Sequence, residues 1–427
     1  MPSLTPLLGI LTILAIGTLL STARTRINWR LVASGVLLQF VIAFLLLRFD
    51  RVVGVFDLFA AGVTRVISFA DAGIVFLFGN LADASKPWGF VFAIKVLPVI
   101  IFFASFMGVL YHVGIMQRVV AGVAWGLRRT MGITGVEALS AAANIFVGQT
   151  EAPLTVRPYL PTMTRSQLMA VMVGGFATIA GSVMAAYIGM LGGESEASRI
   201  LFAKHLMTAS VMSAPAGLVM GKLMLPETDT PRPETVRALM HDERTTANVL
   251  DAAAAGATDG LKLAANVAAM LVAFVALLAM VNWPIGALSE WGPIAAWREA
   301  RGLPVFNLQT LLGYPLTPLA WLIGVPWADA PRVGALMGTG IIATEFVAYV
   351  DLARHVRDGT MSPRACQIAA YCLCGFANIP SIAIQIGGLS ALAPTRRADL
   401  VSLAPRAMVA GALACWMTGA CAALFIV

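Results

Sequence analysis

The chain alternates long apolar runs with short polar segments. Several runs approach or exceed the roughly 20 residues that cross a bilayer as a helix. They are residues 4–20, 31–47, 90–115, 166–191, 206–225, 263–283 and 405–427. A further run, residues 365–394, is long but interrupted. No stretch alternates apolar and polar residues as the strands of outer-membrane barrels do. The pattern therefore predicts an all-α integral membrane protein.

Two segments, residues 133–163 and 321–358, are long enough to enter and leave a membrane but too interrupted to cross it once. We expect each to be a re-entrant helical hairpin, alongside about eight transmembrane helices. Residues 52–82 are amphipathic, so we expect them to lie along the membrane interface. Residues 284–320 are rich in Pro and Trp and are predicted to be loop-like.

Composition agrees with a membrane protein. Of the 427 residues, 59% are hydrophobic and only 12% are charged, against roughly 25% charged in a soluble domain. The net charge of +7 is attributed to Arg-rich cytoplasmic loops and not to a nucleic-acid partner. Residues 4–20 lack the features of a signal peptide and are read as a retained span. The five cysteines show no C-x-x-C spacing, so we expect buried free thiols.

A short motif occurs twice. "GFATIAGS" (175–182) and "GFANIPS" (375–381) each lie within an apolar run, and each follows a predicted hairpin that carries a Thr-Glu pair, ending at Glu151 and at Glu345. An odd number of crossings separates the hairpins, so the second copy is expected to be inverted. Inverted repeats with broken helices, and with substrate and ion bound between them, are a known transporter plan.

The repeat gives the predicted domain organisation. The N-terminal spans and interfacial helix cover residues 1–89, the first repeat 90–225, a cytoplasmic loop 226–260 and the second, inverted repeat 261–427. Within the repeats, the hairpins are 133–163 and 321–358, and the broken helices are 166–191 and 365–394.

The stretch "ANIFVGQTEAPLTVRPYL" (143–160) places a carboxylate in an apolar setting. Gly148 and Pro153 interrupt the helix, and irregular backbone within a membrane is tolerated only where it is buried in protein or lines a polar cavity. An intramembrane carboxylate costs roughly 3 kcal/mol or more and marks a functional site by default. Glu151 and Glu345 are each expected at the start of a half-helix, where the helix dipole favours negative charge.

These residues also carry a resemblance. "GQTEAPLTVRPYL", "GFATIAGSVMAAYIG", "SAPAGLVMGKLMLPE", "NVLDAAAAGATDGLKLAANVAAML", "TEFVAY" and "CGFANIPSIAIQIGGL" resemble the concentrative nucleoside transporter family, in order and from about residue 90 to the C-terminus. The resemblance implies a homotrimer in which a scaffold part holds a moving transport part. It also implies uptake of nucleosides of the uridine, cytidine and adenosine class, coupled to sodium or, in some members, to protons.

The resemblance implies roles for individual residues. Base recognition falls on Gln149, Thr150 and Glu151, with Val183 and Phe376 lining the base. Ribose binding falls on Glu345, Asn378 and Ser381, and this set suits vicinal hydroxyls because a carboxylate can accept from both. The sodium site falls on the side chains of Asn144 and Thr178 and the carbonyls of Val147 and Ile179. One departure is Pro380, where many relatives carry a small polar residue.

Several alternatives stay open from the sequence. They are a proton-coupled nucleoside symporter, a passive channel and an intramembrane enzyme that uses Glu151 and Glu345 as acid and base. The sequence contains no H-E-x-x-H, G-x-S-x-G or P-loop motif that would support the enzyme hypothesis. No cofactor is expected besides the coupling ion.

Arg24, Arg26 and Arg30 place the first loop in the cytoplasm, and the expected location is a plasma membrane of the bacterial inner-membrane type.

Overall fold

The computed structural model describes residues 4–82, 91–193, 195–231, 246–303 and 305–426, and these residues form helices and no strand. The first part of the chain contains α1 (Thr5–Leu19), η1 (Arg24–Arg26), α2 (Trp29–Leu47), α3 (Asp50–Ser68), α4 (Ala70–Phe78), η2 (Gly79–Ala82), α5 (Phe92–Lys95), α6 (Leu97–His112) and α7 (Ile115–Met131). The first hairpin and the helices after it are α8 (Gly135–Asn144), η3 (Ala152–Thr162), α9 (Arg165–Ala177), α10 (Gly181–Gly192) and α11 (Glu196–Met224). The remainder contains α13 (Val249–Ser289), α14 (Gly292–Glu299), α15 (Leu308–Ile323), α16 (Ala330–Ile342), α17 (Glu345–Asp358), α18 (Pro363–Cys372), α19 (Ile379–Leu392), η4 (Pro394–Arg396) and α20 (Arg397–Ala423).

Length and apolar composition make the molecule an all-α membrane protein, as the sequence predicts. Seven helical stretches in the described residues are long and apolar enough to cross a membrane. They are Trp29–Leu47, Arg51–Ala82, Ala93–His112, Arg165–Gly192, Glu196–Met224, Val249–Ser289 and Pro394–Ala423. The stretch 51–82 qualifies by composition although α3 is amphipathic, so its expected place along the interface stays a prediction.

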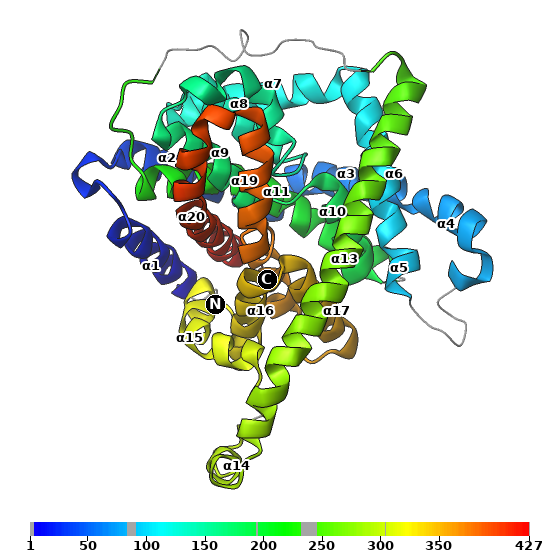
Figure 1. The fold of residues 1–427 in the computed structure, drawn as a ribbon, viewed down its shortest axis with the longest axis vertical. Coiled ribbons are helices and arrows are strands. Elements are labelled where there is room, and N and C mark those ends of the chain that lie inside the picture. Colours follow the sequence, from blue (N-terminus) through cyan, green and yellow to red (C-terminus); the bar gives the residue numbers. More distant parts are fainter. Residues whose placement is uncertain (1–3, 83–90, 194, 232–245, 304, 427) are drawn as a thin grey trace.

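The helix α13 corrects two expectations about loops. It is a long helix (Figure 1) of 41 residues that contains Pro284. It begins at Val249 because the Asn248 side chain accepts a hydrogen bond from the Asp251 N–H, which caps the helix early. The last part of the expected loop 226–260 is therefore helical, while residues 232–245 of that loop lie outside the described residues. Residues 284–320 are likewise largely helical, since they contain α14 and most of α15.

Both hairpins are present, but their limbs differ. In the second hairpin, α16 and α17 are α-helices separated by two residues, 343 and 344. In the first, α8 is an α-helix, whereas the second limb, η3, is a 3-10 helix that contains Pro153, Pro158 and Pro161. Proline lacks the N–H that an α-helical ladder needs, so these residues explain the difference.

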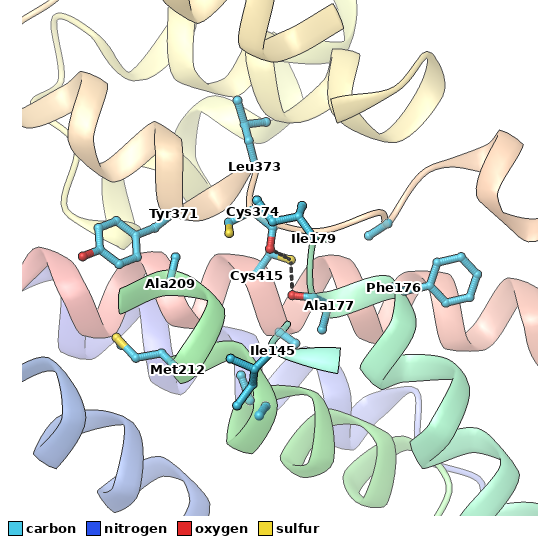
Figure 2. Close-up of a cluster of buried hydrophobic side chains, with 14 of the residues drawn as sticks. Ile145, Phe176, Ala177, Ile179, Ala209, Met212, Tyr371, Leu373, Cys374 and Cys415 are labelled. Carbon is cyan, nitrogen blue, oxygen red and sulfur yellow. Dashed lines mark hydrogen bonds between the residues drawn. The ribbon is translucent and has the colours of Figure 1, made fainter. Parts of the chain in front are cut away.

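The two predicted broken helices are confirmed, and their breaks meet in the buried centre. The first break separates α9 from α10 at residues 178–180, and the second separates α18 from α19 at residues 373–378. The backbone N–H of Phe376 donates to the carbonyl of Thr178 at 3.3 Å. A Cβ added to Gly375 would lie 2.6 Å from the carbonyl oxygen of Phe176, so only glycine permits this approach. Figure 2 shows Ala177, the last residue of α9, and Ile179 of the first break beside Cys374 of the second break.

The helix α20 packs against this crossing. Its Cys415 thiol donates to the carbonyl of Ala177 at 3.5 Å (Figure 2). All five cysteines are buried and free, which confirms the prediction of buried free thiols.

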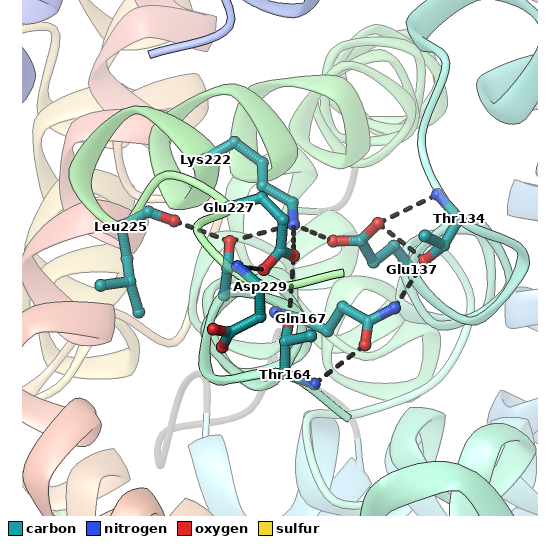
Figure 3. Close-up of polar contacts among 9 residues, drawn as sticks. Thr134, Glu137, Thr164, Gln167, Lys222, Leu225, Glu227 and Asp229 are labelled. Atoms are coloured by element: carbon teal, nitrogen blue, oxygen red, sulfur yellow. Dashed lines mark hydrogen bonds and ion pairs between the residues drawn. The ribbon is translucent and has the colours of Figure 1, made fainter. Parts of the chain in front are cut away.

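A buried ionic cluster joins the base of the first hairpin to the helices beside it (Figure 3). The Lys222 ammonium at the end of α11 contacts the carboxylate of Glu137 in α8 and lies 3.1 Å from that of Glu227. The Gln167 amide in the first turn of α9 donates at 3.1 Å to the hydroxyl of Thr134, which caps α8. We call these five residues the Lys222 cluster. The cluster fixes the starts of α8 and α9 relative to the end of α11.

In the second repeat, a simpler pair of hydrogen bonds joins the base of the hairpin to the broken helix. Asp329 directly precedes α16, and its carboxylate accepts from the hydroxyl of Ser362 at 2.6 Å and from its N–H at 3.2 Å. Ser362 in turn caps α18. In both repeats, therefore, the base of the hairpin is bonded to the N-terminal end of the broken helix that follows.

Candidate functional site

Glu345 lies at the junction of three elements. It is the first residue of α17, where Thr344 caps the helix. One of its carboxylate oxygens accepts from the Tyr187 hydroxyl of α10 at 3.1 Å, and the other accepts from the Asn378 amide at 2.6 Å. The residue is only 5% exposed. A helix N-terminus and two side-chain donors thus stabilise a carboxylate that would otherwise be costly in the membrane interior.

A chain of hydrogen bonds continues from Glu345 to the first hairpin. Asn378 caps α19, and its side-chain oxygen accepts from the Ser381 N–H at 2.8 Å. The Ser381 hydroxyl accepts from the Gln149 amide at 3.2 Å. The chain Glu345–Asn378–Ser381–Gln149 therefore connects the second hairpin, the second break and the tip of the first hairpin, and all four residues are buried.

The other expected base-binding residues lie around this chain to different extents. Thr150 packs beside α19, where a Cβ added to Gly388 would lie 3.0 Å from the Thr150 methyl carbon. Val183 is buried and Phe376 is half-buried. The backbone carbonyl of Phe376 accepts from the N–H of Asn378 at 2.9 Å, so Phe376 is bonded to the Glu345–Gln149 chain through its backbone.

Glu151 has different surroundings from Glu345. It directly precedes η3, and its carboxylate accepts from the Gly148 N–H at 2.5 Å, which closes the hairpin tip. Its side chain is exposed to a cavity of about 420 Å³ that Ser182 of α10 also lines. The two carboxylates therefore share a position at the start of a half-helix but not a common pocket.

Two polar residues of the site were missed in the sequence. Tyr187 holds Glu345, and Gln385 of α19 donates from its amide to the Met172 carbonyl at 3.0 Å. The amide oxygen of Gln385 is buried and has no partner among the described residues. Gln385 follows Ser381 by one helical turn in an apolar helix, so the spacing could have indicated it. A tyrosine in an apolar run gives no comparable signal.

The residues expected to bind the ion lie at the C-terminal ends of two half-helices. Asn144 is the last residue of α8, and Val147 follows it in the hairpin tip. Thr178 and Ile179 directly follow α9. The C-terminal end of a helix carries the negative end of its dipole, and such ends with unwound carbonyls bind sodium in transporters of this plan.

The chemistry of these residues suits a monovalent cation. The side-chain oxygen of Asn144 is buried and has no hydrogen-bond partner among the described residues. Its amide nitrogen donates to the Ser140 carbonyl at 3.0 Å, so the free oxygen is the acceptor that a cation would use. A Cβ added to Gly174 would lie 2.9 Å from that nitrogen, which places Asn144 against α9. The Thr178 hydroxyl donates to the Gly174 carbonyl at 2.9 Å and keeps its lone pairs available.

Comparison with known families gives matches along most of the chain. Profiles described as the Na+ dependent nucleoside transporter N-terminus and C-terminus match residues 8–81 and 205–423, and one described as nucleoside recognition matches residues 93–194. The chain belongs to the concentrative nucleoside transporter family. It is therefore a multi-pass membrane transporter, and the alternative of an intramembrane enzyme is wrong.

Individual relatives match between 90% and 100% of the chain. A protein of Haemophilus influenzae described as an uncharacterized transporter is 42% identical over 100% of this chain and 98% of its own length. Sodium/nucleoside cotransporter 1 of Rattus norvegicus is 40% identical over 90% of this chain, which spans 58% of the rat protein. The structure of CNTnw in an inward-facing substrate-bound state has a TM-score of 0.90 and 41% identity, and the match covers 100% of this chain and 98% of that one.

Proposed function

We propose that this protein takes up nucleosides across a plasma membrane by sodium symport. The observation that carries the proposal is the Glu345–Asn378–Ser381–Gln149 chain. It brings one carboxylate, two amides and one hydroxyl from both repeats to the place where the broken helices cross. Such a set can accept from vicinal ribose hydroxyls and can read the donor and acceptor edge of a base.

In this proposal the two ends of the nucleoside meet different hairpins. Glu345, Asn378 and Ser381 bind the ribose, while Gln149 and Thr150 contact the base. Val183 and Phe376 line the base, and Phe376 offers a stacking face. Glu151 contributes from the cavity side of the hairpin tip. Nucleosides of the uridine, cytidine and adenosine class carry both a base and a ribose, whereas a nucleobase alone lacks the ribose.

Sodium is the proposed coupling ion because the four oxygens of its site are neutral. Asn144, Thr178, Val147 and Ile179 present no group that titrates near neutral pH, so this site is suited to a cation and not to proton exchange. The relative from rat is named a sodium/nucleoside cotransporter. We further propose that the protein forms a homotrimer in a membrane of the bacterial inner-membrane type and transports by alternating access. An inward-facing state is described for CNTnw.

The test is uptake of radiolabelled uridine, cytidine and adenosine into liposomes that contain the purified protein. Uptake is driven in separate experiments by an inward sodium gradient, by an inward proton gradient in choline, and by neither. We expect concentrative uptake with sodium alone. Uptake driven only by the proton gradient would show that the coupling ion is the proton and not sodium. Equal downhill flux in all three conditions would indicate a channel.

A further inference from the structure

The cavity beside Glu151 has two walls that belong to different parts of the molecule. One wall is formed by the hairpin tip, with Gly148 and Glu151, and by Ser182 at the start of α10. The other is formed by α6 and α13, which run side by side in Figure 1. None of Glu345, Asn378, Ser381 and Gln149 lines this cavity. Its volume of about 420 Å³ lies within the range of about 300–1,000 Å³ that is typical of small-molecule sites.

The wall of α6 and α13 is held together by close backbone packing. A Cβ added to Gly108 of α6 would lie 2.7 Å from the Ala252 carbonyl oxygen, and one added to Gly256 of α13 would lie 2.6 Å from the Ala104 carbonyl oxygen. The Ser105 hydroxyl also donates to the Ala253 carbonyl at 2.8 Å. Small residues that allow such close approach are typical of tightly associated membrane helices. A ligand in the cavity would therefore touch this paired wall on one side and the hairpin on the other.

On this side of the cavity, Tyr111 of α6 and Gln117 of α7 carry polar atoms that the protein itself does not satisfy. The hydroxyl of Tyr111 and the side-chain oxygen of Gln117 are buried and have no partner in the described part of the chain, and both residues line the cavity. The amide nitrogen of Gln117 donates to the Tyr111 carbonyl at 2.7 Å, which fixes the two residues beside one another. Nearby, His112 and Thr246 bond to each other at 2.7 Å. Unpartnered buried polar groups are destabilising, and either oxygen gains a partner when a ligand enters the cavity and the side chain turns toward it.

The position of the cavity connects the nucleoside site with one side of the membrane. Glu151 is two residues from Gln149, which ends the hydrogen-bonded chain of the site. Tyr111 lies at the end of α6, and Thr246 precedes α13. The helix α7, which follows α6 and carries Arg128 and Arg129 in its last turn, lies at this end of the molecule (Figure 1). Basic residues are typical of the cytoplasmic side of a membrane protein.

We propose that this cavity is a second nucleoside subsite, occupied in transit between the Gln149–Ser381 contact and the cytoplasm. Tyr111 of α6 and Gln117 of α7 bind the nucleoside from the side of the cavity opposite the hairpin, while Glu151 faces it from the hairpin. The proposal rests on the proposed function, because it assumes that nucleosides occupy the site described above. A neutral ligand with several hydroxyl and amide groups matches a phenol and an amide, which can donate and accept, and a carboxylate, which accepts.

The experiment uses 5-iodouridine, a photoreactive nucleoside, on the full-length protein in liposomes with sodium. After irradiation, labelled residues are located by mass spectrometry, with and without excess uridine. We expect uridine-protected label in two places: near residues 144–151 and 376–385, and separately on residues 104–117 or 252–263. The double variant Tyr111→Phe, Gln117→Leu should reduce the second label by about tenfold relative to the first, as expected for the loss of one or two hydrogen bonds. The single variant Tyr111→Phe removes only a hydroxyl and should show a smaller loss in the same direction.

Tyr314→Phe is the matched control, because Tyr314 lies in α15 and does not line the cavity. Its label pattern should equal that of the wild type. Protected label confined to residues 144–151 and 376–385 at every concentration would overturn the transit subsite while supporting the proposed function. An unchanged label ratio in both variants would overturn the role of Tyr111 and Gln117. Complete absence of uridine-protected label would instead overturn the proposed function itself.

Discussion

Glu345 accepts from two side chains, Tyr187 and Asn378, that come from two other elements. We predict that Glu345→Gln weakens ribonucleoside binding more than Phe376→Leu does. Glutamine replaces one acceptor oxygen with an amide donor, which then faces a donor of Tyr187 or Asn378. A hydrogen bond to a charged group contributes about 1.5–3 kcal/mol, so we expect at least roughly tenfold weaker binding. Leucine at the half-buried Phe376 keeps an apolar contact. Isothermal titration with uridine measures both effects.

Deoxynucleosides provide the control for this assignment. If Glu345 binds the ribose, wild-type protein should bind 2′-deoxyuridine and 3′-deoxyuridine more weakly than uridine. In the Glu345→Gln variant, the difference in affinity between uridine and the two deoxynucleosides should be smaller. Glu290→Gln, at the exposed end of α13, should leave all three affinities unchanged. Equal affinity of the wild type for uridine and both deoxynucleosides would show that Glu345 does not contact the ribose hydroxyls.

At the scale of elements, the Lys222 cluster should determine the stability of the first hairpin. Glu137 is 2% exposed and Lys222 is 9% exposed by side chain. Removing one partner of a buried pair leaves an uncompensated charge and costs about 3–5 kcal/mol, so Lys222→Met should markedly lower the thermal unfolding temperature in detergent. The double variant Lys222→Met, Glu137→Gln should recover part of the loss because no charge is left unpaired between these two positions.

The matched control is the exposed pair of Lys262 and Asp259, with side chains 69% and 74% exposed. Exposed pairs contribute about 0–1 kcal/mol, so Lys262→Met should shift the unfolding temperature far less. Equal shifts for Lys222→Met and Lys262→Met would mean that the cluster contributes no more than a surface ion pair.

The elements were predictable to the extent that local sequence determines them. Gly148 and Pro153 predicted the first hairpin, the interrupted segment 321–358 with its Thr-Glu pair predicted the second, and the repeated Gly-Phe-Ala motif predicted both breaks. The 3-10 geometry of η3 depends on how successive prolines are accommodated, and the early start of α13 depends on the Asn248 cap; neither alters the apolar pattern. The hydrogen bond between Gln149 and Ser381 joins residues 232 positions apart, and only the packing of the two repeats brings them together. The family resemblance named both residues without predicting their contact.

At the scale of the whole molecule, the proposed ion site is connected to the nucleoside site by two routes. Asn144 and Val147 lie at the first hairpin, whose tip continues to Gln149. Thr178 lies in the first break, and its carbonyl accepts from the N–H of Phe376 in the second break, two residues before Asn378. An ion bound between Asn144 and Thr178 should therefore order both sides of the nucleoside site. Nucleoside affinity should rise with sodium, and linkage requires sodium affinity to rise equally with nucleoside.

We predict that the double variant Asn144→Ala, Thr178→Val removes this sodium dependence and leaves weak, sodium-independent binding, because the Glu345–Gln149 contacts remain. Uridine affinity is measured in sodium and in choline for wild type and variant. In uptake, one positive charge that moves through the membrane potential contributes about 2.3 kcal/mol per 100 mV. That exceeds the roughly 1.4 kcal/mol of a tenfold concentration ratio, so the variant should also lose concentrative uptake in response to a negative interior potential. A wild type without a sodium effect, or a variant that retains one, would contradict the ion site and make proton coupling through Glu151 or Glu345 the leading hypothesis.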